Sequence, residues 1–446
     1  MIDSLPVPRA VPEAPAGRSI AGLGDPGARL LAGPAVGAET LAAHVARLGP
    51  LSPPAGLADL WQMVAASGLR GRGGGGFPSA RKLEAARLAP GEPVVIVNVA
   101  ESEPASRKDH VLGSCRPHLV LDGAVAVAAL VGATEVVVHA HRSKTGGGVL
   151  RAVDRAIGER RRAGLAEPRW LLSAGPDGYV SGEASAVASF VDGGVARPRF
   201  SGNRMATEGP SGRPTVVLNA ETVAHLGYLA HVGLDGWWAP DAPDGPRLVT
   251  LAGAVSVEGL VLEVGGWATL GDILQQAGWS VPPAAVLVGG YSGTWIDGPT
   301  AWSTRFDRPG LHGVGGRPGC GLVAVLPHGA CGLAETARLA RYLAGQSAGQ
   351  CGPCVQGLAG VADGIEALVA GRLRRRGLHR LEVLSSSVVG RGACSHPDGV
   401  AHLVASALRV FAADAAHHLT GRTCEGTGHP PAFAVPTDRP TPVTWR

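Results

Sequence analysis

The 446-residue chain is too long for one ordinary hydrophobic core, so about two to four domains are expected. Hydrophobic residues make up 45% of the sequence and aromatic residues only 4%, so the cores must depend on alanine, valine and leucine. The net charge of +4 comes from dispersed basic residues, which argues against nucleic-acid binding.

The sequence shows no signal-peptide pattern and no membrane-spanning run. The N-terminal residues lack a charged start followed by an apolar run, and no window reaches ~18 uninterrupted apolar residues. We therefore expect no signal peptide and no membrane span. The expected location is cytoplasmic, at most peripheral to a membrane complex.

A glycine-rich loop opens the first expected domain, residues 56–240, after a poorly ordered lead of residues 1–55. A helix over 57–67 runs into this loop, Gly68–Gly76, which holds six glycines in nine positions. Because so many glycines leave few side chains in the way, the backbone of this loop can approach a ligand closely and direct several N–H groups at it. The loop ends at Phe77-Pro78, and Lys82, one of only three lysines, follows. We expect an anionic nucleotide-type cofactor here.

Alternating strands and helices follow the loop and predict a parallel α/β layer. The expected strands are 93–98 and 135–140, and the expected helices are 117–132 and 148–163. Ligands of such sheets bind at the carboxyl ends of the strands. Asn98 and Glu101 fall at that end of the first strand.

Two further domains are expected. Residues 246–328 predict a small β-grasp domain, with a hairpin over 248–264, a helix over 270–277, a strand over 285–288 and a return strand over 319–326. Residues 331–425 predict a helical bundle, with helices over 333–344, 355–370 and 400–418. A loose, proline-rich tail is expected over 426–446.

Three of the seven cysteines form a metal or iron–sulfur signal in the helical domain. Cys351 and Cys354 have CxxC spacing, and Cys394 lies 40 residues further on. Taken alone, these cysteines allow an iron–sulfur cluster, a zinc site with His396 as fourth ligand, or plain thiols. We interpret Cys115, Cys320 and Cys331 as small core residues, and assign no role to Cys424 and no metal to His417-His418.

Taken together, these motifs resemble the flavin- and NADH-binding subunit of respiratory complex I, the F-subunit family, and the related diaphorase subunits of NAD-linked hydrogenases and formate dehydrogenases. The resemblance covers about residues 55–425, in the family's order. Its motifs are the glycine loop with Lys82, Asn98 with Glu101-Ser102-Glu103-Pro104 and Lys108-Asp109, Gly178–Glu183, Arg213–Thr222, and Ser347–Gly357 with Cys394.

The resemblance implies a Rossmann-like flavin domain, a β-grasp domain of the SLBB type and a helical iron–sulfur domain. It also implies hydride transfer from NADH to FMN and single-electron transfer to the cluster. The cofactor-binding residues that it implies are Gly71, Arg72, Gly73, Gly74, Gly76, Lys82, Asn98, Glu101, Ser102, Tyr179, Gly182, Glu183, Asn219 and Thr222. Tyr179 and Glu183 are the implied catalytic residues, and Cys351, Cys354 and Cys394 the implied cluster ligands. Expected partners are a thioredoxin-like [2Fe–2S] subunit or a ferredoxin.

The chain departs from the family's pattern at four places. Alanine replaces an aspartate at Ala100, a glutamate at Ala184 and a cysteine at Ala348, and residues 200–206 lack the aromatic, proline-containing pattern that helps to hold NADH. Three cysteine ligands leave a [4Fe–4S] cluster with one non-cysteine ligand, or a [3Fe–4S] cluster. The leading hypothesis is an electron-transfer flavoprotein that uses NADH, FMN and such a cluster. The alternatives are a flavin relay fed by a ferredoxin-like donor, and a structural paralogue that has lost its redox chemistry.

Overall fold

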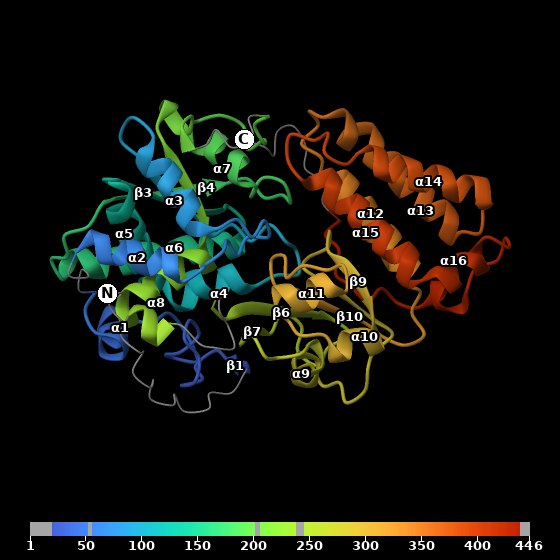
Figure 1. Ribbon diagram of the computed structural model, residues 1–446, viewed down its shortest axis with the longest axis horizontal. Coiled ribbons are helices and arrows are strands. Elements are labelled where there is room, and N and C mark those ends of the chain that lie inside the picture. Colours follow the sequence, from blue (N-terminus) through green and yellow to red (C-terminus); the bar gives the residue numbers. More distant parts are fainter. Residues whose placement is uncertain (1–19, 52–55, 201–205, 238–244, 438–446) are drawn as a thin grey trace, which may run out of the picture.

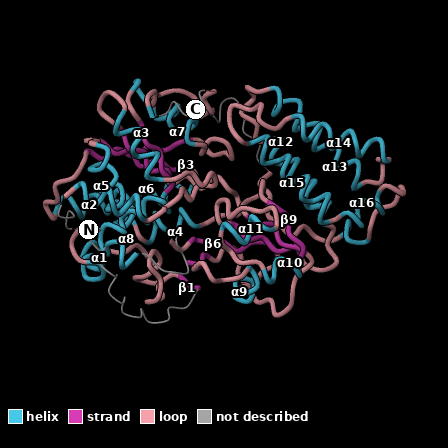
Figure 2. Tube along the Cα trace, in the orientation of Figure 1, coloured by secondary structure: helices cyan, strands magenta, loops and turns pink. Residues whose placement is uncertain are grey.

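The computed structural model describes residues 20–51, 56–200, 206–237 and 245–437. Within them the chain forms a four-stranded sheet with its helices, a six-stranded sheet with three short helices, and a set of helices (Figures 1 and 2). The first sheet and the helical part lie on opposite sides in Figure 1, and the six-stranded sheet lies below and between them.

The first sheet is entirely parallel, with the strand order β4-β3-β2-β5. Its strands are β2 (Val94–Asn98), β3 (Glu135–His141), β4 (Arg169–Gly175) and β5 (Thr215–Asn219). Val95 and Val97 face a large core, whereas Val94 and Ile96 face a smaller one that includes Val187 of α7. Both faces of β2 are therefore covered, as its continuous apolar run predicts.

Eight helices surround this sheet in the described residues. They are α1 (Leu41–Leu48), α2 (Leu57–Ala66), α3 (Ser79–Leu88), α4 (Lys108–Cys115), α5 (Pro117–Val131), α6 (Lys144–Arg162), α7 (Ala184–Val191) and α8 (Ala220–Trp237), with a 3₁₀ turn at Pro210–Gly212. Helices α5 and α8 touch through glycine. A Cβ on Gly123 would lie 1.8 Å from the Val223 carbonyl oxygen, so no larger residue permits this close approach.

The second sheet is mixed, with the strand order β1-β7-β6-β10-β8-β9. Its strands are β1 (Ile20–Gly22), β6 (Arg247–Gly253), β7 (Val261–Val264), β8 (Ala285–Val288), β9 (Thr294–Asp297) and β10 (Leu322–Leu326). Helices α9 (Leu270–Gln276), α10 (Gly298–Ser303) and α11 (Arg308–Gly313) accompany it. Strands β6 and β10 pair in parallel, and the other neighbours pair antiparallel.

The last part of the chain is helical. It contains α12 (Gly332–Gly345), a π-helical turn η3 (Pro353–Leu358), α13 (Ala359–Val369), α14 (Arg375–Ser387), α15 (His396–Val410), α16 (Ala412–His418) and a 3₁₀ turn η4 (Glu425–Gly428). The π turn begins two residues after Cys351 and contains Cys354. Such turns often mark functional sites within helices.

The expectation of a poorly ordered lead over residues 1–55 is wrong for residues 20–51. Strand β1 pairs with β7, and Leu30 and Leu31 are fully buried. The buried Glu263 carboxylate accepts hydrogen bonds from the backbone N–H groups of both leucines and of Arg29. These bonds fix the lead against the second sheet. Residues 1–19 and 52–55 lie outside the described part of the chain.

The expectation of a loose tail over residues 426–446 is wrong for residues 426–437. Phe433 is only 2% exposed and stacks on Trp295 and Tyr291. The backbone carbonyl of Phe433 accepts a hydrogen bond from Arg338, which fixes the segment against α12. One apolar side chain thus anchors a proline-rich stretch, and residues 438–446 lie outside the described part.

None of the helices in the described residues is by itself long and apolar enough to cross a membrane. Two bent pairs, α4 with α5 and α15 with α16, have the length and apolar composition of a span only when the two helices of each pair are counted together.

Candidate functional site

The glycine-rich loop is a tight turn between α2 and α3. Its two ends pair through a bridge between Arg70 and Pro78, and the Gly71 N–H donates to the Phe77 carbonyl at 2.8 Å. Gly74 and Gly76 have φ values of +107° and +60°, and nothing lies within 4 Å of where their Cβ atoms would be. The outer edge of the turn is therefore open to a ligand.

Arg72 differs from the expected role, because its side chain is directed into the protein. It is only 1% exposed, and its guanidinium donates to the Gly245 carbonyl and lies 4.0 Å from Glu221. Its backbone N–H donates to the Thr222 hydroxyl. Arg72 and Thr222 thus join the loop to α8. The positive charge of Arg72 is directed toward Glu221 inside the protein and not toward the open edge of the loop.

Lys82 lies on α3, where the loop ends. Its ammonium donates to the Val217 carbonyl of β5 at 2.6 Å, and it also lines the cavity described below. Burial lowers the pKa of Lys82, and the nearby Glu183 carboxylate opposes that shift. Lys82 is the cavity-lining cation on the helix that follows the loop.

The two asparagines at the strand ends lie side by side, because Asn98 of β2 and Asn219 of β5 are partners in the sheet register. The Asn98 amide donates to the Gly182 carbonyl at 2.9 Å. Gly182 packs closely against Ser102, since a Cβ there would lie 1.8 Å from the Ser102 hydroxyl. The strand end and the Gly178–Glu183 segment are thus in direct contact.

A buried charge network lies beneath these asparagines. The Lys108 ammonium bonds the Asp109 carboxylate at 2.9 Å, the Glu221 carboxylate at 3.1 Å and the Asn219 side-chain oxygen at 3.1 Å. These partners more than compensate for burial and raise the pKa of Lys108 above its usual range. Lys108 and Asp109 therefore belong among the site residues, although the family resemblance implied no individual role for either.

Two glutamates of the strand-end segment have raised pKa values. Burial and the neighbouring Asp109 raise the pKa of Glu101 to about 7, although Glu101 accepts the N–H groups of Asp109 and His110 at the start of α4. Burial raises the pKa of Glu103 to about 8. One Glu103 oxygen accepts the Tyr291 N–H at 3.0 Å, and the other has no hydrogen-bond partner among the described residues. Glu103 therefore favours its neutral form at the junction of the two sheets.

The two expected catalytic residues have structural contacts of their own. The Tyr179 hydroxyl pairs with the Ser292 hydroxyl at 2.8 Å, and its N–H donates to the Gln346 side chain. Burial raises the pKa of Tyr179 well above its usual value. The Glu183 carboxylate caps α7 by accepting the N–H groups of Ser185 and Ala186. Tyr179 joins all three parts of the fold, and Glu183 faces the cavity from a helix N-terminus.

One cavity of about 1530 Å³ collects these residues from all three parts of the chain. The expected binding residues that line it are Gly71, Gly73, Gly74, Gly76, Lys82, Asn98, Glu101, Ser102, Tyr179, Gly182, Glu183, Asn219 and Thr222. Further lining residues, not expected individually from the sequence, include Glu103, Lys108, Asp109, Ser292 and Arg317. The first three stand in motifs that the sequence already singled out, whereas Ser292 and Arg317 reach the cavity only through the tertiary fold.

Two of the departures from the family's pattern also face this cavity. Ala100 and Ala184 line it, so neither position supplies a hydrogen-bonding side chain there. The third departure, Ala348, lines the cysteine pocket. Residues 201–205, which contain most of the fourth departure, lie outside the described part of the chain.

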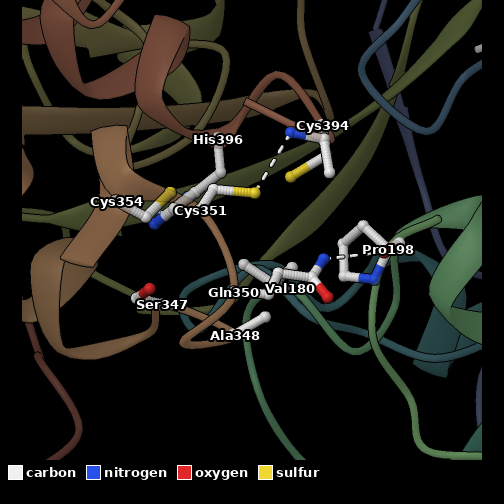
Figure 3. Close-up of a pocket in the computed structure, with 10 residues that line it drawn as sticks. Val180, Pro198, Ser347, Ala348, Gln350, Cys351, Cys354, Cys394 and His396 are labelled. Atoms are coloured by element: carbon white, nitrogen blue, oxygen red, sulfur yellow. Dashed lines mark hydrogen bonds between the residues drawn. The ribbon is translucent and has the colours of Figure 1, made fainter. Parts of the chain in front are cut away.

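The three expected ligand cysteines surround a small separate pocket (Figure 3). Cys351, Cys354 and Cys394 line it with Ser347, Ala348 and His396. Burial raises the pKa of Cys354 to about 12 and that of Cys394 to about 11. Cys394 and His396 also line the large cavity, so the two hollows adjoin.

The spacing of these sulfurs bears on what they could hold. Among the described residues, two groups of three potential ligands lie within 4.8 Å of one another, and the pocket cysteines form neither of them. His396 bonds the Leu343 carbonyl at 2.8 Å through Nε2. A single tetrahedral zinc ion requires sulfurs about 3.8 Å apart. The pocket cysteines are therefore not grouped as closely as a single zinc ion would need, which disfavours the alternative zinc site with His396.

Comparison with known proteins gives two family matches. Residues 64–227 match the family model described as the Nuo51 FMN-binding domain. Residues 334–418 match the model described as the NADH-ubiquinone oxidoreductase-F iron-sulfur binding region. The first match contains the glycine loop and the strand ends, and the second contains all three pocket cysteines.

Relatives extend over most of the chain. It is 29% identical over 384 residues to the F 2 subunit of NADH-quinone oxidoreductase from Rhizobium meliloti, covering 82% of this chain and 90% of the relative. It is 27% identical over 380 residues to the F subunit of NADH-quinone oxidoreductase from Streptomyces coelicolor, covering 82% and 84%.

A solved structure shares the fold. The NAD⁺-reducing [NiFe]-hydrogenase in its H₂-reduced state contains a chain with a TM-score of 0.73 and 28% identity. The match covers 81% of this chain but 62% of the hydrogenase chain, so this chain spans less than two thirds of that neighbour's length. The expectation of an α/β fold with a parallel sheet is confirmed at this level.

The raised pKa of Glu103 predicts that the stability of the flavin-free chain depends on pH. The folded state keeps a proton on this carboxyl up to a pH of about 8, whereas an unfolded glutamate releases it near a pH of about 4.5. The free energy of unfolding should therefore fall as the pH rises through this range, by on the order of a few kcal/mol. Glu103→Gln should remove this part of the loss, as measured by denaturant unfolding at several pH values.

Glu84→Gln is the matched control, because Glu84 is exposed on α3. That variant should keep the wild-type pH dependence. An unchanged pH dependence in Glu103→Gln would show that Glu103 ionises normally in the folded chain. Glu101 retains its own contribution in both variants, since its pKa is also raised.

Proposed function

We propose that this chain, which is similar to F subunits of NADH-quinone oxidoreductase, passes electrons between NADH, FMN and an iron–sulfur cluster. The observation that carries the proposal is the continuity of the large cavity. It begins at the open glycine loop and extends to Cys394, which also lines the cysteine pocket. We therefore assign the flavin site and the cluster site to the two ends of this cavity.

The first end of the cavity fits the phosphate and ribityl parts of FMN. The glycine loop has free space on its outer edge, and we propose that its backbone N–H groups and the Lys82 ammonium supply donors for an anion. Asn98 and Asn219 supply amides at the adjoining strand ends. When bound, the flavin supplies hydride acceptance and single-electron donation, while the protein supplies position and electrostatics.

Two buried ionisable side chains of the site, Lys108 and Glu103, carry no uncompensated charge. Lys108 is already neutralised by Asp109 and Glu221, and Glu103 favours its neutral form. We propose that Glu183, held at the start of α7, and Tyr179, held by Ser292, border the reacting ring. Both side chains are fixed by contacts within the protein, which preorganises the site.

The cysteine pocket fits a cluster with three thiolate ligands. Ala348 stands where the family's pattern has a cysteine, so the fourth iron position would take a non-cysteine ligand or be absent. The Ser347 hydroxyl and His396 line the same pocket and are the candidate protein ligands for it. The cysteine thiols must lose their protons to bind iron. The raised pKa values of Cys354 and Cys394 oppose this loss until the metal is present.

A second candidate function is favoured by Ala100 and Ala184. Both alanines line the cavity at positions where the family's pattern has carboxylates. In the family's pattern the carboxylate at position 100 contacts the flavin and the carboxylate at position 184 lies on the nicotinamide side, so this chain lacks one contact of each kind. A flavin relay fed by a ferredoxin-like donor would need no nicotinamide contacts.

We further propose the finer features of the assembly. The six-stranded sheet is assigned as a β-grasp domain of the SLBB type, and residues 331–425 as an iron–sulfur helical domain. The names of the relatives describe subunits, so we propose redox partner subunits, either a thioredoxin-like [2Fe–2S] subunit or a ferredoxin, in a complex peripheral to a membrane.

The visible spectrum of anaerobically purified protein tests the main proposal. We expect flavin and iron–sulfur absorption, and bleaching of the flavin when NADH is added. Bleaching by dithionite but not by NADH would replace NADH with another donor. A colourless protein after reconstitution with FMN, iron and sulfide would contradict both redox functions.

Lys82→Gln tests the flavin end of the cavity. The substitution removes a charged donor, which contributes about 1.5–3 kcal/mol, so the FMN dissociation constant should rise roughly ten- to hundred-fold. Quenching of FMN fluorescence on titration with flavin-free protein measures the constant. Arg81→Gln is the control, because Arg81 is exposed on the same helix. Equal effects of the two variants would assign the change to general electrostatics.

Ala348→Cys tests the cluster end. A fourth thiolate should raise the iron content of the reconstituted protein toward four per cluster and make the cluster slower to lose iron in air. Iron and sulfide analysis with EPR measures both. Ala344→Cys on α12 adds a cysteine that does not line the pocket and should leave the iron content unchanged. Cys351→Ala should abolish the cluster signal, and its persistence would contradict the ligand assignment.

A further inference from the structure

A second group of potential metal ligands lies in the helical part, outside the cysteine pocket. Cys331, His418 and Cys424 place their ligand atoms within 4.8 Å of one another. Cys331 precedes α12, His418 ends α16, and Cys424 precedes η4. We propose that these three residues, the tail site, bind one Zn²⁺ ion.

The distances suit zinc. A tetrahedral ion with Zn–S near 2.3 Å and Zn–N near 2.05 Å separates a sulfur and a nitrogen ligand by about 3.6 Å. The Cys331 Sγ and His418 Nε2 atoms are 3.6 Å apart. The pair therefore already has the separation of two neighbouring corners of a zinc tetrahedron.

The histidine is oriented as metal-binding histidines usually are. Its other ring nitrogen, Nδ1, lies 3.1 Å from the Arg422 carbonyl oxygen. A hydrogen bond to that carbonyl places the proton on Nδ1 and leaves the lone pair of Nε2 directed at the sulfurs. His418 is fully buried, so the ring is also held by packing.

The two cysteines are held beside each other by the backbone. The Cys331 N–H donates to the Gly426 carbonyl at 3.1 Å, two residues after Cys424. Cys331 is 3% exposed, whereas Cys424 is half-buried and lies 3.3 Å from the Thr427 hydroxyl. The more open side at Cys424 lets a water molecule complete the tetrahedron.

The other compact ligand group is of a different kind. His44 and His231 each lie 2.6 Å from the same Asp122 oxygen. Those are hydrogen-bond distances, and Arg160 bonds the second Asp122 oxygen. No space for an ion separates the groups, and hydrogen bonding accounts for the arrangement. The softer sulfur ligands and the wider spacing of the tail site distinguish it.

The position of the tail site gives the ion a structural function. Cys331 and Cys424 stand just outside the two ends of the matched iron–sulfur region, residues 334–418. An ion shared by them closes the helical part into a loop and holds the segment that continues to Phe433. Binding free energy at such a site stabilises the folded state.

The test uses the full chain in which the pocket cysteines are replaced, C351S/C354S/C394S, so that iron–sulfur chemistry does not contribute. After reduction and equilibration with Zn²⁺, elemental analysis should find about one ion per chain. Adding Cys424→Ser or His418→Gln should reduce the zinc content at least ten-fold. Adding Cys115→Ser, at a half-buried cysteine outside the tail site, should leave it unchanged.

Co²⁺ in place of Zn²⁺ gives a readout independent of stoichiometry. A tetrahedral site with two thiolates should show thiolate-to-cobalt charge transfer, which Cys424→Ser should weaken. Zn²⁺ should also raise the melting temperature of the chain that keeps Cys424 but not of the Cys424→Ser chain. Absence of stoichiometric zinc in the reduced chain would overturn the proposal. A Cys331–Cys424 disulfide in protein isolated without oxidant would overturn it as well.

Discussion

The candidate site depends on the contacts that the buried Lys108 ammonium makes with its neighbours. It lies among Asp109, Asn219 and Glu221, which belong to α4, the end of β5 and the start of α8. An unpaired charge at this depth would cost several kcal/mol, so the three elements are held in one arrangement. Glu221 also lies beside Arg72, which ties the glycine loop to the same network.

That network explains why the loop can remain open. The side chain and the N–H of Arg72 bond within the protein, and these contacts hold the turn against α8. The opposite wall is fixed in a comparable way. Tyr179 is held by Ser292 and Gln346, and Glu103 accepts the Tyr291 N–H across the junction of the two sheets. These contacts hold the parts of the fold that line the cavity against one another, which lowers the entropy cost of binding.

The sequence predicts the parts of this arrangement that local patterns determine. The apolar run before Asn98 forms β2 nearly as expected, and the glycine loop, the helix before it and the CxxC turn lie where the motifs indicate. Edge strand β4 was not predicted, because the exposed side chains of Leu171 and Leu172 give it no clean alternation. The inward direction of Arg72 was also missed. It depends on Gly245, which is far away in the sequence.

The same limit applies to the chain ends and to the tail site. Proline and glycine in the tail suggest looseness, yet Phe433 fills a space between Trp295 and Tyr291 that only the folded second sheet creates. Likewise, Cys331 and Cys424 have no short-range spacing that would indicate a shared ligand. Local pattern detects contacts within a few residues, and it fails where loop closure over many residues brings groups together.

The three alanines that depart from the family's pattern all lie at the segment Gly178–Glu183. A Cβ on Gly182 would lie 3.8 Å from the Ala100 side chain, Ala184 directly follows the segment, and Ala348 packs in one small core with Val180. The loss of polar groups is therefore concentrated between the strand ends and the cysteine pocket, while the glycine loop and Lys82 keep theirs. These two regions belong to different elements of the fold. The buried network of Lys108 supports the region of the glycine loop and Lys82, so it is needed there whichever donor supplies the electrons.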